Sequence, residues 1–405
     1  MRDRLTRFLA IPFSVRLAWT LWLVLVAAVG VRVAVSKPTS QTVLPIYLAA
    51  GERWLSGESL YGPTQTLDVY RNPPVVAAGF AALTQLPEKV AGLLVRGVGV
   101  ALFLTGLWRV RRALLPDWGP SRVGWLFALA VVPAVPSVNN GQLNLHLAAL
   151  ALHGVASAAR GHWSASAAWV GLAVWVKVYP LSLGLLVTLV APPRYAVALL
   201  AVVLLGALLP FALDDLATAR TQYAEYVQSL RLDDRTHDDL SRVPRDWTAI
   251  PRTWLGWVSP GPLTKAVSLA VAAGLALLTL VRRGRPLGES LLAALVGSHV
   301  WMTAFGPATE MNTYSLLAAV APLVVLTPGL SRSARVVAVA GYALLVATVL
   351  RGMFPNDRDF NVLGPQALGA VLLATAYLST APPQASLVSR TRERREQVPV
   401  DNAGG

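Results

Sequence analysis

Long apolar runs alternate with short polar connectors along most of the sequence. Each run holds roughly 15 to 20 residues, close to the length that a helix needs to cross the hydrocarbon core of a bilayer. We therefore expect an all-α, polytopic helical membrane protein with about twelve transmembrane helices. The expected spans are residues 16–35, 90–108, 121–138, 143–158, 164–178, 179–191, 195–212, 264–281, 287–305, 312–327, 335–351 and 362–380.

The polar segment after the first run contains an amphipathic stretch and leads into a short apolar one. Within this first outer loop, residues 36–74, the stretch LPIYLAAGERWLSG is amphipathic and should lie on the membrane surface. The stretch PPVVAAGFAALTQLP follows at residues 73–87. It holds only about 13 apolar residues between prolines, too few for a comfortable span, so we expect a re-entrant or interfacial helix.

Arginines in the connectors decide how the chain is oriented in the membrane. The run at residues 90–108 ends in RVRR, and treating the short segment before it as a full span would place RVRR outside. Because positively charged connectors stay on the cytoplasmic side, we expect both termini to be cytoplasmic, in the plasma (inner) membrane.

The same topology predicts one integral membrane domain, residues 1–383. It includes a second, longer outer loop at residues 213–262, which carries mixed charges and aromatic residues typical of a membrane interface. The last residues, 384–405, are polar and charged, and we expect them to form a disordered cytoplasmic tail.

Composition supports the membrane interpretation and excludes several kinds of function. Hydrophobic residues make up 55% of the chain and charged residues only 14%, whereas soluble domains carry about 25% charged residues. The net charge of +14 does not indicate nucleic-acid binding, because the arginines fall in short connectors rather than on one face. The absence of cysteine excludes disulfides, thiolate metal sites and thiol nucleophiles.

Polar side chains gather on the outer side of this topology, first in the turn PSVNNGQLNLH, residues 136–146. Amide side chains there can donate to and accept from sugar hydroxyls, or they can cap two helix ends. Four amides exceed what capping needs, which favours a binding role. They belong to Asn139, Asn140, Gln142 and Asn144.

Two basic residues lie inside apolar runs. Lys177, in AVWVKVYP, can extend its ammonium group to the outer interface. Alternatively, the following Tyr179 and Pro180 break the helix, and the turn presents the ammonium group to an anion. Arg96, in LLVRGVGV, has a similar pair of interpretations, as a ligand of a lipid phosphate or as the partner of an outer-loop carboxylate.

Carboxylates occur in two outer motifs. LDVYRNPP places Asp68, Tyr70 and Arg71 directly before the short apolar segment, where the prolines fix the direction of the chain. Asp68 can be functional there, or it can simply pair with Arg71 on the surface. GPATEMNTY, residues 306–314, places Glu310 between two apolar runs. Burying a carboxylate there costs free energy, which favours a functional role.

An acidic stretch in the long outer loop, RLDDRTHDDLSRVPRDW, suggests a divalent-cation site. The arginines between its acidic residues favour a solvated loop that balances its own charge instead. The remaining histidines have no ligand-like spacing, so we expect no metal site. The candidate ligands in this stretch are Asp233, Asp234, His237, Asp238 and Asp239.

The order of these motifs resembles that of glycosyltransferase family 87, the GT-C membrane mannosyltransferases that use a polyprenyl-phosphate sugar. The resemblance rests on YLAAGERWLSGESLYG, then YRNPP before the short apolar segment, then NNGQLN, WVKVYP and GPATEMNTY. It covers most of the chain from residue 47 to residue 326. Each motif is weak alone, and the specificity lies in their order.

The resemblance implies an inverting transfer of a hexose, mannose, from a polyprenyl-phosphate donor to a hydroxyl of a lipid or glycan acceptor on the outer face. A carboxylate acts as general base, cations stabilise the leaving phosphate, and neither a cofactor nor a metal is needed. We assign Lys177, Arg96 and Arg71 to the donor phosphate. The residues that we assign to the sugar are Asn140, Gln142, Asn144, Tyr70, Asn312 and Tyr314.

The sequence departs from the family pattern at one position. Family members commonly carry an aspartate just before the tyrosine of the amphipathic segment, and this chain has Gln41, Thr42 and Val43 there. We rank Glu310 first and Asp68 second as replacements, whereas Glu52 and Glu58 are expected to be solvated. The vacant acid position leaves open an alternative function, a non-catalytic flippase or transporter of lipid-linked sugars on the same scaffold.

Overall fold

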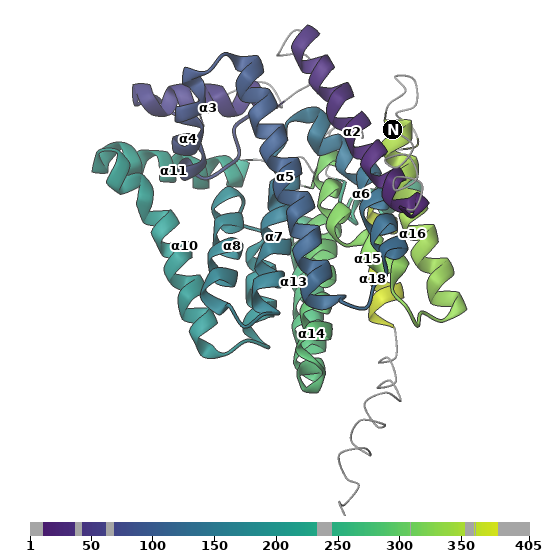
Figure 1. The fold of residues 1–405 in the computed structure, drawn as a ribbon. Helices are drawn as coiled ribbons and strands as arrows, with labels where there is room; N and C mark the ends of the chain where they lie inside the picture. The colour runs from purple at the N-terminus through teal and green to yellow at the C-terminus, as the bar shows by residue number, and fades with distance from the viewer. Residues whose placement is uncertain are drawn as a thin grey trace, which may run out of the picture.

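A computed structural model describes residues 11–36, 43–61, 69–232, 245–307, 309–352, 360 and 362–379. Every regular element in these ranges is helical, as expected (Figure 1). The expected tail, residues 384–405, lies outside the described residues, as does the acidic part of the long outer loop.

Six helices in the described ranges are long and apolar enough to cross a membrane. Each coincides with one expected span, so a helix of sufficient length and apolarity is confirmed at these positions. The six are α2 (Phe13–Val35), α5 (Glu88–Leu114), α6 (Pro120–Asn140), α10 (Pro193–Leu213), α13 (Gly261–Val281, continued by the 3₁₀ turn η2, Arg282–Gly284) and α16 (Arg332–Arg351).

The other expected spans coincide with shorter helices. The clearest difference is at residues 179–191, where the only helix has eight residues and is about 12 Å long. Pro180 and Pro192 bracket this helix and limit its length. The shorter helices are α7 (Asn144–Ala158), α8 (Trp163–Val176), α9 (Leu181–Thr188), α14 (Leu287–Val300) with η3 (Trp301–Phe305), η4 (Met311–Ala319) with α15 (Ala321–Leu326), and α18 (Pro365–Leu378).

The predicted amphipathic helix is α3 (Leu44–Ser56), and it lies crosswise to the bundle at the upper end in Figure 1. Its buried residues recur at helical spacing on one face, which packs on α4 (Pro74–Ala81). Gly51 allows this contact, because a Cβ atom there would lie 2.9 Å from the backbone of Phe80 and Ala81. The short apolar segment thus forms α4 and the 3₁₀ turn η1 (Ala82–Gln85).

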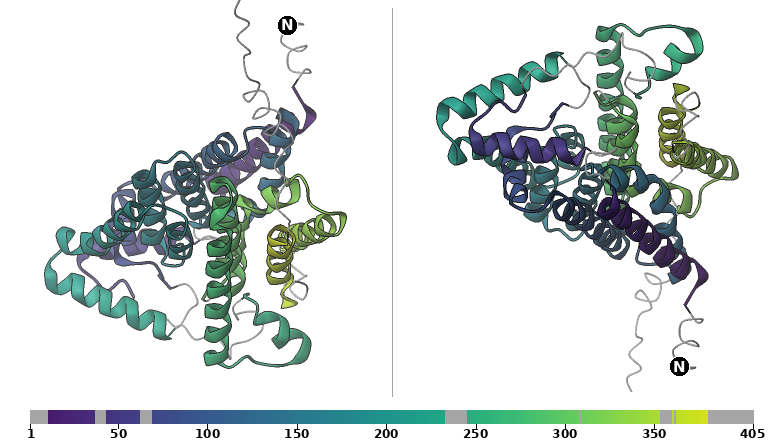
Figure 2. Two further views of the ribbon diagram at one scale, coloured as in Figure 1. Left: turned by 90° about the horizontal axis from the view of Figure 1, so that it is seen from below. Right: turned by 90° about the horizontal axis from the view of Figure 1, so that it is seen from above.

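The long outer loop is more helical than its sequence suggests. It contains α11 (Leu216–Leu232) and α12 (Ala249–Leu255). Like α3, α11 lies across the upper end of the bundle in Figure 1, and it contacts α4. Seen along the bundle, α10 and α11 lie on one side, and α16 and α18 lie on the opposite side (Figure 2).

Helix α7 forms the centre of the bundle, since each of its residues except His146 is buried. It packs between α5 and α8. Around it, α2 runs parallel to α6, because Trp22 Nε1 donates to the carbonyl of Phe127 at 3.0 Å near one end and Arg32 donates to the carbonyl of Asn139 at 2.8 Å near the other.

The two ends of the bundle differ in chemistry. The arginine-rich end of α5 and the connectors that precede α8, α10 and α14 lie at the lower end in Figure 1. The motifs YRNPP, NNGQLN and WVKVYP lie toward the other end, beneath α3 and α11. The predicted separation of basic connectors from polar motifs is therefore present in the fold.

Candidate functional site

The motif WVKVYP separates helices α8 and α9, and a residue of the YRNPP loop forms a hydrogen bond at this break. Helix α8 ends at Val176, Lys177 is extended (φ −149°, ψ 144°), and α9 starts at Leu181 after Pro180. The break leaves the carbonyl of Val176 without a helical donor. The side-chain amide of Asn72 donates to this carbonyl at 2.8 Å. The helix break predicted from the sequence is thus bound to the first outer loop.

Asn72 is a site residue that the sequence reasoning missed. It is buried, and its own carbonyl accepts a hydrogen bond from the Tyr61 hydroxyl at 2.6 Å. The Tyr70 hydroxyl donates to the carbonyl of Pro73 at 3.1 Å. These bonds fix the chain on both sides of Arg71. The available signal was an amide side chain next to two prolines, where the backbone direction is fixed and few conformations remain.

Arg71 and Glu310 meet across the site. Nη1 of Arg71 lies 3.6 Å from Oε1 of Glu310, and the two side chains are 25% and 39% exposed. Glu310 is the residue that precedes η4, and its backbone N–H donates to Oγ1 of Thr313 at 3.3 Å. The ion pair therefore joins two motifs that lie far apart in the sequence.

Lys177 lies in the same region. Its Nζ atom is 5.5 Å from the centroid of the Tyr179 ring. Tyr47 on α3 interacts electrostatically with both Lys177 and Glu310. Burial raises the pKa of Tyr47, Lys177 opposes this rise and Glu310 adds to it. The hydroxyl of Tyr47 is consequently protonated at neutral pH and does not supply a base.

An amide network connects three of the motifs. The Asn144 side chain donates to Oε1 of Gln142 at 2.7 Å and to the carbonyl of Asn312 at 3.0 Å. The Tyr179 hydroxyl donates to Oδ1 of Asn144 at 3.3 Å. Asn140, in the same turn, accepts a hydrogen bond at its carbonyl from the N–H of Val43, at 3.0 Å. The network places NNGQLN next to both WVKVYP and GPATEMNTY.

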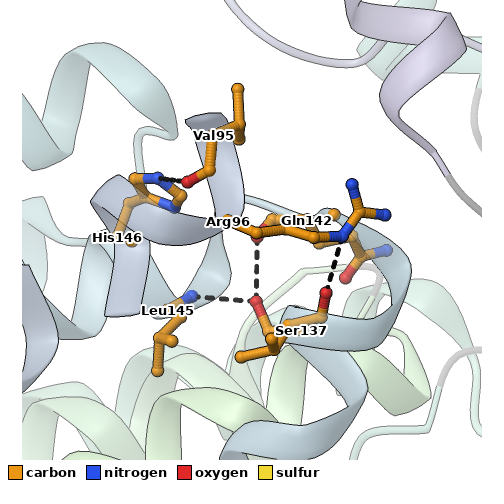
Figure 3. Close-up of a pocket in the computed structure, with 9 residues that line it drawn as sticks. Val95, Arg96, Ser137, Gln142, Leu145 and His146 are labelled. Atoms are coloured by element: carbon orange, nitrogen blue, oxygen red, sulfur yellow. Dashed lines mark hydrogen bonds between the residues drawn. The ribbon is translucent and has the colours of Figure 1, made fainter. Parts of the chain in front are cut away.

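The Arg96 side chain forms hydrogen bonds with the end of helix α6. Its guanidinium donates to the carbonyls of Val138 at 2.9 Å, Gly92 at 3.0 Å and Asn139 at 3.3 Å, and the side chain is buried. Figure 3 shows Arg96 next to Gln142 and Ser137. The adjoining cavity measures about 10 Å³, which is room for one water molecule but not for a phosphate group. Gly141 ends α6 with φ 68°, and a side chain there would collide with this guanidinium.

Two tyrosines assigned to the sugar are bonded to the protein backbone. Tyr70 donates to Pro73, as described above, and burial raises its pKa. Tyr314 is also buried, and its hydroxyl donates to the carbonyl of Arg245 at 2.6 Å. The Arg245 N–H in turn donates to the carbonyl of Thr309 at 2.6 Å. Both tyrosines thus hold the loops around the site in place.

Some of the predicted candidates lie outside the described residues, namely Asp68, Gln41, Thr42, Asp233, Asp234, His237, Asp238 and Asp239. Glu52 and Glu58 are exposed. Within the described ranges there is no group of three or more histidine or acidic side chains that could hold a metal ion.

Chemically, the site offers one carboxylate, two cations and several amides at the same end of the bundle. The carboxylate of Glu310 can accept a proton, whereas Arg71 and Lys177 can bind an anion.

A search of curated proteins finds no match. The family model for glycosyltransferase family 87 matches residues 70–307, which include YRNPP, NNGQLN and WVKVYP. That match spans more than half of the chain, which therefore belongs to glycosyltransferase family 87 and is a membrane glycosyltransferase.

Proposed function

We propose that this protein transfers a hexose, mannose, from a polyprenyl-phosphate donor to a hydroxyl group of a lipid or glycan acceptor, with inversion at the sugar. The observation that carries the proposal is the meeting of Arg71 and Glu310 at 3.6 Å. A carboxylate next to a guanidinium supports the proposal, because the reaction requires a proton acceptor and a cation that binds phosphate.

In this proposal Glu310 is the general base. The acceptor hydroxyl gives its proton to the carboxylate, its oxygen forms a bond to the anomeric carbon, and the bond from that carbon to the phosphate oxygen breaks. The electron pair leaves with the polyprenyl phosphate. Because a phosphate is already a good leaving group, no general acid is required. Asp68 remains the second candidate for the base.

Arg71 and Lys177 stabilise the negative charge on the departing phosphate. Arg71 pairs with Glu310 before the donor binds, and the phosphate competes for the same guanidinium. Donor binding thereby releases the carboxylate for the acceptor. The fixed backbone around Arg71 and the extended conformation of Lys177 support this assignment. We leave Arg96 out of the donor site, because its guanidinium is bonded to backbone carbonyls.

Amide side chains at this end of the bundle bind the hexose hydroxyls. Asn312 follows Glu310 by two residues and has a half-buried side chain. Asn144 and Gln142 are buried and bonded to each other, so they support the sugar site by holding the chain around Asn312 in place. Asn140 belongs to the same turn. Tyr70 and Tyr314 support the surrounding loops, since their hydroxyls are bonded to backbone carbonyls.

We further propose that the chain has about twelve membrane spans in the plasma membrane, with both termini in the cytoplasm. The short helices α8 and α9 form a broken pair that opens toward the outer face. The segment of α4 and η1 is re-entrant or interfacial. The two ends of the bundle support this orientation, because the arginine-rich connectors lie opposite the polar motifs.

Transfer is tested with purified protein in proteoliposomes, a radiolabelled polyprenyl-phosphate hexose and a panel of hydroxyl acceptors. Glu310→Gln should lower kcat by about 10²- to 10⁴-fold, the usual contribution of a general base. Glu52→Gln is the matched control, because Glu52 is an exposed carboxylate on α3 at the same end of the bundle. An unchanged unfolding temperature shows that each variant is folded.

Wild-type transfer by Glu310→Gln would remove Glu310 from this role, and a loss in Asp68→Asn would then assign the base to Asp68. The competing function, a carrier of lipid-linked sugars, predicts a different result. Such a protein transfers no hexose to any acceptor but moves the labelled donor between leaflets. A protected-reagent assay on the same proteoliposomes measures that movement.

A further inference from the structure

A second polar cluster lies at the arginine-rich end of the bundle, along the seam where α7 packs between α5 and α8. Thr105, Trp108 and Arg112 recur at helical spacing on α5 and are exposed, so this stripe faces the membrane side of the bundle. Arg109, next to the stripe, turns toward α7 and is partly buried. The seam is therefore accessible from the membrane at this end.

Two neutral side chains of α7 hold the guanidinium of Arg109. Nη1 lies 2.9 Å from Nδ1 of His153, and Nη2 donates to Oγ of Ser157 at 3.1 Å. Because a guanidinium only donates, Nδ1 of His153 must accept, and the ring proton is then on Nε2. Nε2 can donate to the carbonyl of Leu102, at 3.1 Å. The histidine thus orients Arg109 without neutralising its charge.

A second cation lies close to the first, and no acidic side chain compensates either of them within the described residues. Arg160, in the connector between α7 and α8, interacts electrostatically with Arg109. Helices α7 and α8 contain no acidic residue, and Glu88 lies at the far end of α5. Asp117 in the next connector forms no ion pair with Arg109 in the part of the chain described here.

An uncompensated guanidinium at the edge of a bilayer is costly unless it meets water or a lipid phosphate. Free snorkelling is restricted here, because His153 and Ser157 hold Arg109 in one direction. The His153 ring is stacked on Trp169 of α8, with centroids 4.8 Å apart, which holds the histidine in turn. Trp108 and Trp169 are aromatic residues of the kind found at the headgroup level.

We propose that this seam binds the phosphate group of an anionic membrane phospholipid, through Arg109 and Arg160. The two positive charges favour a headgroup with a net negative charge, such as phosphatidylglycerol. A choline headgroup would bring its own positive charge close to Arg160. The site is at the opposite end of the bundle from Glu310, and the proposal does not depend on the sugar-transfer reaction.

The test uses delipidated full-length protein in a neutral detergent, titrated with phosphatidylglycerol or with phosphatidylcholine of the same acyl chains. Native mass spectrometry measures lipid occupancy, and the unfolding temperature reports stabilisation. Wild-type protein should bind phosphatidylglycerol at least about fivefold more tightly than phosphatidylcholine. Arg109→Gln and Arg160→Gln should each weaken phosphatidylglycerol binding about five- to tenfold, as expected for one surface cation.

Arg122→Gln is the matched control, because Arg122 is an exposed arginine at the same end of the bundle that lies over the ring of Trp118. It should leave binding unchanged. If Arg109→Gln does not fold, Arg160→Gln still tests the proposal, because Arg160 lies in an exposed connector and its substitution leaves the contacts of Arg109 intact. Equal affinity for both lipids, wild-type binding by Arg160→Gln, or an equal loss in Arg122→Gln would each overturn the proposal.

Discussion

Arg71 and Glu310 form an ion pair with an N–O distance of 3.6 Å although they come from the first outer loop and from a motif near the end of the helical bundle. Partly exposed ion pairs of this kind contribute only about 0–1 kcal/mol to stability. The pair therefore contributes little to the stability of the fold, which is compatible with the roles proposed above for its two residues. Three features hold it in place, namely the Asn72 bond to Val176, the Tyr70 bond to Pro73 and the start of η4 at Met311.

The proposed division of roles predicts different kinetic effects for the two partners. Arg71→Gln should raise KM for the polyprenyl-phosphate donor and lower kcat/KM at least about tenfold, because a charge-assisted bond to phosphate is lost. Arg71→Lys should recover part of the loss. Steady-state kinetics with varied donor concentration measure both. Arg220→Gln, an exposed arginine of α11, is the control, and an equal defect there would indicate a general loss of surface charge.

Asn72 should be essential for the geometry of the broken helix. Asn72→Ala leaves the Val176 carbonyl without its donor, and a buried unsatisfied carbonyl costs about 1–3 kcal/mol. We expect a lower unfolding temperature and, because Lys177 follows Val176, a higher donor KM. Differential scanning fluorimetry and donor kinetics check the two effects. Gln85→Ala, an exposed amide of η1, should change neither, and normal donor KM in folded Asn72→Ala would contradict the positioning role.

Hydropathy and charge predicted the general arrangement of the chain but not its exact helices. The six long spans, the amphipathic α3 and the break at Lys177 follow from local sequence, since length, periodicity and proline act within a few residues. The shortness of α9 is less evident, because apolar residues continue beyond the helix to Pro192. A hydropathy average does not distinguish a helical segment from an irregular one that neighbouring helices bury.

The sequence identified the motifs that contain the site residues, but it did not identify which of their side chains contact one another. The sequence indicated Arg71, Lys177, Asn144 and Glu310 as candidate site residues, and the fold brings their motifs to one end of the bundle. It did not indicate which of them touch. Arg96 looked like a phosphate ligand for the same reason, yet its guanidinium donates to two backbone carbonyls at the end of α6 and to one of α5. Such contacts depend on the tertiary packing of helices far apart in sequence, which no local pattern encodes.

Arg96 should therefore matter for stability rather than for donor binding. Arg96→Gln removes the bonds of the guanidinium and leaves the carbonyl of Val138 without its donor, whereas the Asn139 carbonyl still accepts from Arg32. We therefore expect a loss of about 1–3 kcal/mol in the free energy of unfolding. Donor KM in the fraction that remains folded should be within about twofold of wild type. Urea unfolding in detergent and donor kinetics measure the two quantities. A large rise in donor KM with normal stability would return Arg96 to the phosphate site.

Helices α3 and α11 should lose stability at alkaline pH. Burial raises the pKa of Tyr47, Tyr61 and Tyr70, and it raises that of Tyr226 to about 12. Since the unfolded phenols titrate near pH 10, the folded state keeps more protons above that pH. The stability from these groups is therefore complete below about pH 10 and is lost as the pH rises from about 10 toward 12.

Hydrogen exchange of peptides from α3 and α11 between pH 8 and pH 11 tests this expectation, after correction for the intrinsic pH dependence of exchange. Protection should fall above about pH 10 in these two helices, whereas α7, whose only ionisable side chains are histidines, should keep its protection. Tyr226→Phe should reduce the loss in α11, because the phenylalanine cannot ionise while its ring can still pack against Tyr61, 5.5 Å away in the wild type. Protection that is constant up to pH 11 in α3 and α11 would show that their tyrosines titrate as they do in the unfolded chain.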